Sequence, residues 1–248
     1  MRLFGLSIIR TFLIVAVFVS QTVEASDVTS ELVVAADKGN LSLVNKIIES
    51  HSGNQEELQA AFWAATKKGH VPIVERLLPM NVEVNWVSDD QYTPLMRAAR
   101  DGREQLVEIL LAAGADVNAM TEEGTALMNA AEKDRRKVIA ILIAANADIN
   151  AKRADDRTAL TLAAQEGHTL TIQALINAGA NVNYQAESSG ATPLMVAVQH
   201  GHYNATYALI AAKADLNLKA KNGMTALGFA NHYRYKDIVD LLKKSGAK

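Results

Sequence analysis

The chain has no cysteine among its 248 residues. A disulfide framework, a thiol nucleophile and a cysteine-bound zinc are therefore excluded, and packing alone must hold the fold together. Aromatic residues are also scarce, at 5%, although hydrophobic residues as a whole reach 49%. A core of alanine, leucine, isoleucine and valine favours closely packed helices over a β-sandwich, which needs more aromatic and β-branched bulk.

The chain also has no large excess of positive or negative charge, because the formal net charge is only −2. Binding to a nucleic-acid backbone requires a positive surface, so nucleic acid is not expected as a partner. There is no glycine-rich phosphate loop and no nucleophile motif such as G-x-S-x-G. The sequence therefore predicts no enzyme, no cofactor and no small-molecule substrate.

Residues 1–25 differ in character from the rest of the chain. Arg2 and Arg10 come early, residues 12–19 are apolar, and small residues occupy positions 23 and 25. This order is typical of a secretory signal peptide that is cleaved before Ser26. The alternative is an uncleaved membrane anchor, but Arg10 leaves an apolar run of about half the roughly 20 residues that a spanning helix needs. We expect an exported protein, in a bacterial periplasm or secreted.

A repeat of 30 to 34 residues fills the remainder, residues 26–248. The leucine of TPL at Leu95 returns in each copy, and seven residues later a glycine or a substitute follows. The positions of this leucine and of its weaker counterparts are Leu32, Phe62, Leu95, Leu127, Leu160, Leu194 and Leu227. A fixed period of this length predicts a stacked array of small helical units.

The sequence of each unit predicts two short helices joined by a turn. Thr93 precedes Pro94, which suits an N-cap followed by a first helical residue with no N–H to satisfy. Gly102 ends that helix, and a second apolar helical pattern follows as far as Gly114, a residue that readily takes the left-handed conformation. Lys213 occupies the position of Gly114 in a later unit, so we expect backbone strain there.

The segments TPLMRAARDG and VEILLAAGADVNA resemble the ankyrin repeat, whose hallmark combines T-P-L-H, A-A, G-H, L-L and G-A-D-V-N. The resemblance implies an all-α ankyrin-repeat solenoid of about seven helix-turn-helix units with short hairpin fingers. The units begin near residues 29, 59, 92, 124, 157, 191 and 224. Between the first two units the chain is too short for a finger, and Asn54 followed by Glu57 predicts a helix start instead.

Histidines and paired acids are the residues of this sequence that could support a metal site or catalysis. His70, His168 and His202 occupy the Gly-His position of the family, which implies that they brace the second helix. His200, His202 and His232 suggest a metal site, but His200 and His202 flank a helix-ending glycine and are expected to point apart, so no metal is predicted. The paired carboxylates lie at neighbouring finger positions, where they should line an edge rather than face across a cleft.

In the ankyrin family, partners usually lie across the fingers and the first helices. The candidate partner-binding residues at those positions are Trp86, Asp89, Asp90, Tyr92, Arg100, Glu122, Glu123, Asp155, Arg157, Glu187, His200, His232 and Tyr233. The central fingers are acidic and give way to Lys219 and Lys221, while Tyr and Trp, typical anchors at interfaces, occur at both margins. This pattern predicts a face for another protein with a basic, partly apolar surface. Alternatively, charged loop tips merely keep an alanine-rich array soluble.

The resulting hypothesis is a non-enzymatic protein-binding module of the cell envelope. Two variants of it are an inhibitor or immunity-type protein and an effector directed at a host cell. The alternatives of another class are an enzyme with unrecognised residues and a purely structural envelope protein.

Overall fold

The computed structural model describes residues 30–50 and 54–248, which form seven pairs of helices in chain order. The first helices of the pairs are α1 (Glu31–Asp37), α3 (Gln55–Lys68), α5 (Pro94–Asp101), α7 (Ala126–Glu132), α9 (Ala159–Glu166), α11 (Pro193–Gln199) and α13 (Ala226–His232). The second helices are α2 (Leu41–Ser50), α4 (Val71–Leu77), α6 (Glu104–Ala112), α8 (Arg136–Ala144), α10 (Thr169–Asn177), α12 (Tyr203–Ala211) and α14 (Lys236–Lys244). A 3-10 helix, η1 (Leu78–Met80), follows α4.

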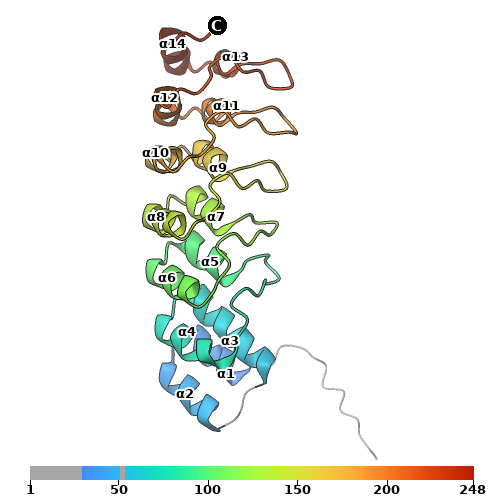
Figure 1. Cartoon of the computed structure of the whole chain (residues 1–248), viewed down its shortest axis with the longest axis vertical. Helices are drawn as coiled ribbons and strands as arrows, with labels where there is room; N and C mark the ends of the chain where they lie inside the picture. Colours follow the sequence, from blue (N-terminus) through green and yellow to red (C-terminus); the bar gives the residue numbers. More distant parts are fainter. Residues whose placement is uncertain (1–29, 51–53) are drawn as a thin grey trace, which may run out of the picture.

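The pairs stack one upon another into an elongated array, with α1 and α2 at one end and α13 and α14 at the other (Figure 1). First helices lie above first helices and second helices above second helices, and the loops between pairs project from the side of the first helices. The expectation of an all-α solenoid of about seven units with projecting fingers is confirmed.

Threonine side chains start most of the first helices, as the sequence predicts. Thr93 Oγ1 accepts a hydrogen bond from the Met96 N–H at 3.2 Å, and Thr192 does the same for Met195. The N-terminal N–H groups of a helix have no partner within it, so such a cap stabilises the helix by about 1 kcal/mol. Asn54 caps α3 through the Glu57 N–H at 2.8 Å, which confirms the predicted helix start.

At five junctions, neighbouring units are joined by a side chain at the start of a second helix. His70, His168 and His202 each place Nε2 2.8–3.0 Å from a carbonyl oxygen in the last turn of the preceding first helix. Arg103 and Arg135 reach the last-turn carbonyls of Thr66 and Arg100 at 2.7 and 2.9 Å. Carbonyl groups in the last turn of a helix have no N–H donor within that helix, and the bond from the next unit supplies one. The bracing role expected of the three histidines is confirmed, and arginine performs it at two further junctions.

These braces explain the recurrent glycine. At Gly167 φ is +72°, and an added Cβ would lie 2.6 Å from Nδ1 of His202. Where Asp134 replaces glycine, φ is still +53°, and the Asp134 carboxylate accepts a hydrogen bond from the Thr171 hydroxyl at 2.6 Å. Lys213 also has a positive φ, of 62°, which agrees with the strain expected there.

The core runs the length of the array as a continuous layer. Leu95, Leu127, Leu160 and Leu194 are each 1% exposed. The alanine pairs of the first helices, such as Ala98–Ala99, are wholly buried. Small side chains let the first helices of adjacent units approach closely, which is why an aromatic-poor sequence can build this core.

The second unit departs from the rest because no finger precedes it. Its first helix, α3, has 14 residues, whereas the other first helices have seven or eight. The side chain of Gln59 bonds both the N–H and the carbonyl oxygen of Glu83, at 2.7 and 3.2 Å. The N-terminal extension of α3 therefore holds the following finger from one side.

The predicted signal peptide, residues 1–25, lies outside the described residues. Among residues 30–50 and 54–248, none of the helices combines the length and the apolar character that crossing a membrane requires.

Replacing Gly167 by alanine should destabilise the protein more than the same change at Gly179. Both glycines have positive φ, and each variant should lose about 1–2 kcal/mol on that account. Only at Gly167 must the new methyl group displace a brace, so about 1 kcal/mol more should be lost with the bond from His202 to Gln165. Urea unfolding of both variants measures the difference, and equal losses would contradict the role assigned to the brace.

Candidate functional site: the finger edge

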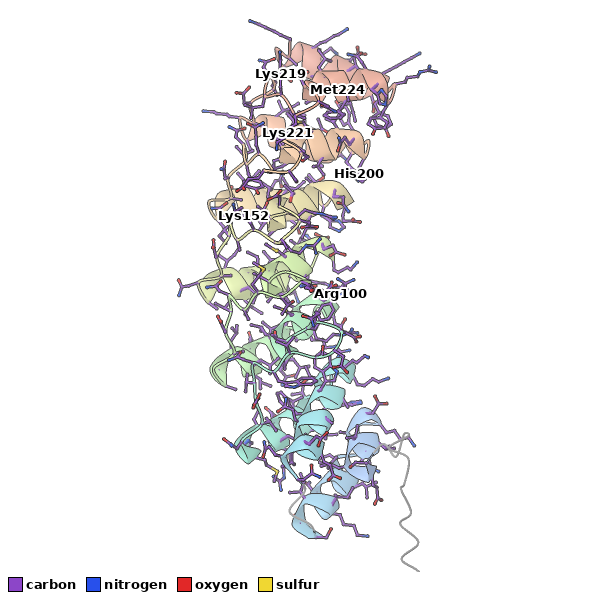
Figure 2. All side chains as sticks on the ribbon, turned by 90° about the vertical axis from the view of Figure 1, so that its right-hand side faces the viewer. Arg100, Lys152, His200, Lys219, Lys221 and Met224 are labelled. Atoms are coloured by element: carbon purple, nitrogen blue, oxygen red, sulfur yellow. The ribbon has the colours of Figure 1, made fainter. Side chains whose placement is uncertain are left out.

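The fingers are the loops 82–92, 115–124, 147–157, 180–191 and 214–224, numbered here first to fifth. Together with the ends of the first helices they form one side of the array, called the finger edge. Figure 2 looks onto this side, with Lys152, Lys219 and Lys221 toward one margin and Arg100 and His200 toward the other. Every candidate residue from the sequence lies on the fingers or at the ends of the first helices.

A ladder of asparagines joins the fingers. Asn118 Oδ1 accepts the N–H of Asp148 in the next finger at 2.7 Å, and Asn150 accepts that of Asn181 at 2.8 Å. Asn85 and Asn183 make the same bond to Asp116 and Asp215, each at 2.8 Å. A finger is therefore tied to the next by a side chain-to-backbone bond, and the edge is ordered before any partner arrives.

Tyr92, a candidate partner-binding residue, is buried rather than free on the surface. It is 8% exposed, and its hydroxyl donates to Oε2 of Glu123 in the second finger at 2.8 Å. Burial, reinforced by the bond to this carboxylate, raises the pKa of Tyr92 to about 12. The Arg100 guanidinium lies 5.8 Å from the ring centroid and 3.5 Å from the carboxylate of Glu132. Tyr92 and Arg100 thus contact each other, and each binds a carboxylate of the next unit.

The third finger was expected to be acidic, but arginines of the same finger neutralise Asp155. Arg153 donates to both carboxylate oxygens of Asp155, at 2.9 and 2.7 Å, and Arg157 Nε lies 2.9 Å from one of them. These bonds, chiefly those from Arg153, lower the pKa of Asp155 to about 2. Lys152 and Glu187 form a further ion pair at 2.6 Å between the third and fourth fingers. The third finger therefore presents little net negative charge.

Negative charge remains available on the first two fingers. Asp89, Asp90 and Glu122 are exposed at or near the tips, and none of them forms an ion pair with another described residue. Val87 and Met120, at matching positions of the same fingers, are 42% and 45% exposed. The sequence reasoning missed these two apolar residues, although their shared position after the ladder asparagine could have identified them.

The opposite end of the edge is basic and aromatic. Lys219 and Lys221 are exposed in the fifth finger (Figure 2) and form no ion pair with other described residues. At the end of α13, the ring centroids of His232 and Tyr233 lie 4.9 Å apart, and Tyr233 is 45% exposed. The finger edge is thus acidic and apolar at its N-terminal part and basic at its C-terminal part.

His200 and His202 do not point apart, contrary to expectation. Their rings are nearly parallel, with centroids 6.1 Å apart, because His202 turns back to brace the Gln165 carbonyl. His200 remains exposed and lines a cavity of about 260 Å³ with Asp155 and Arg157. No group of three or more possible metal ligands occurs in residues 30–50 and 54–248.

Trp86 lies in the first finger with its ring centroid 5.7 Å from that of Trp63 in α3, at an interplanar angle of 67°. Both rings are half-buried and line a cavity of about 680 Å³ beside the N-terminal part of the finger edge. Trp63 was missed in the sequence because it lies in a weak copy of the repeat, at a position that no other copy fills with an aromatic residue.

Substituting Tyr92 by phenylalanine should remove the hydrogen bond between Tyr92 and Glu123, one of those that join the first two fingers. The pKa of the phenol is raised above its unfolded value of 10, so its stabilising contribution is complete below pH 10 and is lost as the pH rises through about 12. At pH 7 the variant should lose about 1–2 kcal/mol of unfolding free energy. Urea unfolding measures the loss, and alkaline titration of tyrosine absorbance should lose its highest step. An unchanged stability at pH 7 would contradict the structural role of Tyr92.

The sequence matches the family described as ankyrin repeats (3 copies) over residues 32–121, 119–186 and 185–248. It is 47% identical over 60 residues to ankyrin repeat domain-containing protein 49 of Homo sapiens, a match that covers 24% of this chain and 25% of that protein. It is 33% identical over 131 residues to an ankyrin repeat protein of Fowlpox virus, covering 52% of this chain and 29% of that protein.

These matches span between a quarter and a third of the length of the two relatives, so they bear on the repeats and not on the activity of either whole protein. The family matches nearly all the described residues, and the helix pairs, braces and asparagine ladder recur from unit to unit. Ankyrin repeats generally serve to bind other proteins and are usually non-enzymatic. This chain belongs to the ankyrin-repeat family.

Proposed function

We propose that this protein binds a partner protein across the first and second fingers and the adjoining first helices. The observation that carries the proposal is the combination of Asp89, Asp90 and Glu122, which are exposed and unpaired among the described residues, with exposed Val87 and Met120 on the same two fingers. Two acids elsewhere on the edge, Asp155 and Glu187, are neutralised by cations of the chain itself.

The chemistry of the edge indicates the kind of partner. Unpaired carboxylates attract a basic surface, and apolar side chains beside them contribute burial when water is expelled. The asparagine ladder supports tight binding, since little conformational entropy is lost when a surface is already ordered. The partner therefore presents a basic, partly apolar surface to the N-terminal part of the finger edge.

Reversing the charge of Asp89, Asp90 and Glu122 to lysine should weaken partner binding by about tenfold or more, since three attractive charges become repulsive. A matched control carries the changes Glu75→Lys, Glu108→Lys and Asp240→Lys, at exposed acids of the second helices that form no ion pair among the described residues. The two variants change the net charge equally, so only position differs.

The partner is first captured on the immobilised protein from native extract and identified by mass spectrometry, and its affinity for the three proteins is then measured by calorimetry. Loss of affinity in the finger variant alone supports the proposal, and it should diminish at high salt. Equal affinity for the finger variant and the native protein would contradict it.

We further propose that the protein is exported and acts in the cell envelope, in the periplasm or after release. The support is the sequence of residues 1–25, with early arginines, an apolar run and small residues before Ser26. Protein isolated from its native source should begin at Ser26, as N-terminal sequencing would show, and fractionation should find it in the periplasm or medium. An N-terminus at Met1 in a cytosolic fraction would contradict export.

A further inference from the structure

A hollow in the surface lies beside Trp63 and Trp86, where α1, α3 and the first finger meet. It has a volume of about 680 Å³. Ala60 and Ala64 of α3 face it with small side chains, and the two indole rings stand at 67° to each other along it. A binding cavity that is largely preformed, apolar and aromatic, with a few polar groups at its rim, is the common form of a specific site.

The hollow exists because of the irregular second unit. In that unit α3 extends beyond the length of the other first helices, and no finger precedes it to lie over its exposed side. Gln59 fixes the backbone of Glu83 against α3 by two hydrogen bonds, which sets the distance between the helix and the first finger. Trp86, three residues further on, is thereby held facing α3. The shape of the cavity is thus a consequence of local bonding.

The rim of the cavity is negatively charged. Glu56 and Glu83 are exposed there, and neither forms an ion pair with another described residue. Asp37 also lines the cavity but pairs with Lys68 at 3.6 Å, and Lys67 is the single cation among the lining residues. The faces of the indole rings add a negative quadrupole potential to that of the carboxylates. The cavity therefore attracts a cation and disfavours an anion.

The tryptophans also offer hydrogen-bond donors. Neither indole N–H is bonded to another residue in the part of the chain that the structure describes. An indole N–H can only donate, so a suitable ligand carries a carbonyl acceptor near its cation. An amino-acid side chain within a peptide meets this requirement, because its own backbone supplies the carbonyl.

We propose that this cavity receives an arginine side chain of the partner protein, with the guanidinium against Trp63 and Trp86 and hydrogen-bonded to Glu56 and Glu83. A guanidinium is planar, weakly hydrated and able to stack on an indole while donating to two carboxylates, whereas a lysine ammonium is a strongly hydrated point charge. This assignment rests on the proposed function, since it places one residue of a basic partner beside the first two fingers.

The two tryptophans are the only ones in the chain, so tryptophan fluorescence reports on this cavity alone. The protein is titrated with N-acetyl-arginine methylamide, and in parallel with the citrulline and lysine analogues. Citrulline keeps the shape and loses the charge. We expect a saturable fluorescence change with the arginine probe at millimolar concentration, and affinities weaker by about tenfold for citrulline and about threefold for lysine.

The double variant Glu56→Gln and Glu83→Gln should bind the arginine probe about tenfold more weakly, with unchanged circular dichroism. The control variant Glu108→Gln removes an exposed carboxylate from α6 and should bind as the native protein does. Replacing Trp63 could affect packing, so the carboxylate variants carry the test. Equal binding of arginine and citrulline, equal or tighter binding of lysine, or unchanged affinity in the double variant would each overturn the assignment.

The arginine-probe titration and the finger charge reversal test the two proposals separately. If the finger charge reversal weakens partner binding and the arginine probe does not bind, partner binding at the finger edge is supported and arginine binding in the cavity is refuted. If the probe binds as expected and the finger reversal leaves partner affinity unchanged, arginine binding in the cavity is supported and partner binding at the finger tips is refuted.

Discussion

Each unit of this protein depends on its neighbours, because a pair of short helices cannot enclose its own leucines. The stack buries them, and it is held in register by two sets of bonds between units. On the helical side, His70, His168 and His202, or an arginine in their place, bond to the last-turn carbonyls of the preceding unit. On the finger side, an asparagine of one finger accepts the backbone N–H of the next. The array is therefore stabilised by nearest-neighbour contacts, as repeat proteins generally are.

The same contacts decide which surface charges are available to a partner. The first two fingers are joined by the bond from Tyr92 to Glu123, beside which Arg100 lies, and Asp155 is paired with two arginines. These side chains bind other residues of the same chain, so they are less available to a partner. The exposed groups without an ion pair include acidic and apolar side chains near the tips of the first two fingers and lysines on the fifth. The cavity between Trp63 and Trp86 adjoins the acidic end, so the features that suit a basic partner gather at one part of the edge.

The fold was predictable from sequence because its determinants are local and repeated. Thr93, Gly102 and Gly114 mark the same helix boundaries that later copies mark, and Asn54 revealed the one irregular junction. The candidate site was predictable only in outline. The partners of Tyr92 and Glu187 lie more than 30 residues away in sequence, in the adjacent unit, where no local pattern reveals them. Trp63 escaped notice because its significance arises only when α3 and the first finger meet, and Arg153 because its partner, Asp155, was interpreted as a free acid.

Residue-resolved amide hydrogen exchange at the fingers tests most directly the claim that inter-unit bonds hold the binding surface in place. The decisive amides are those of Asp116, Asp148, Asn181 and Asp215, each of which donates to an asparagine of the preceding finger. If these bonds order the fingers, we expect the four amides to exchange at least about a hundredfold more slowly than those of an unstructured peptide, despite lying in exposed loops. Exchange within about threefold of the unstructured rate would show that the fingers move independently and would contradict a surface ordered by the stack.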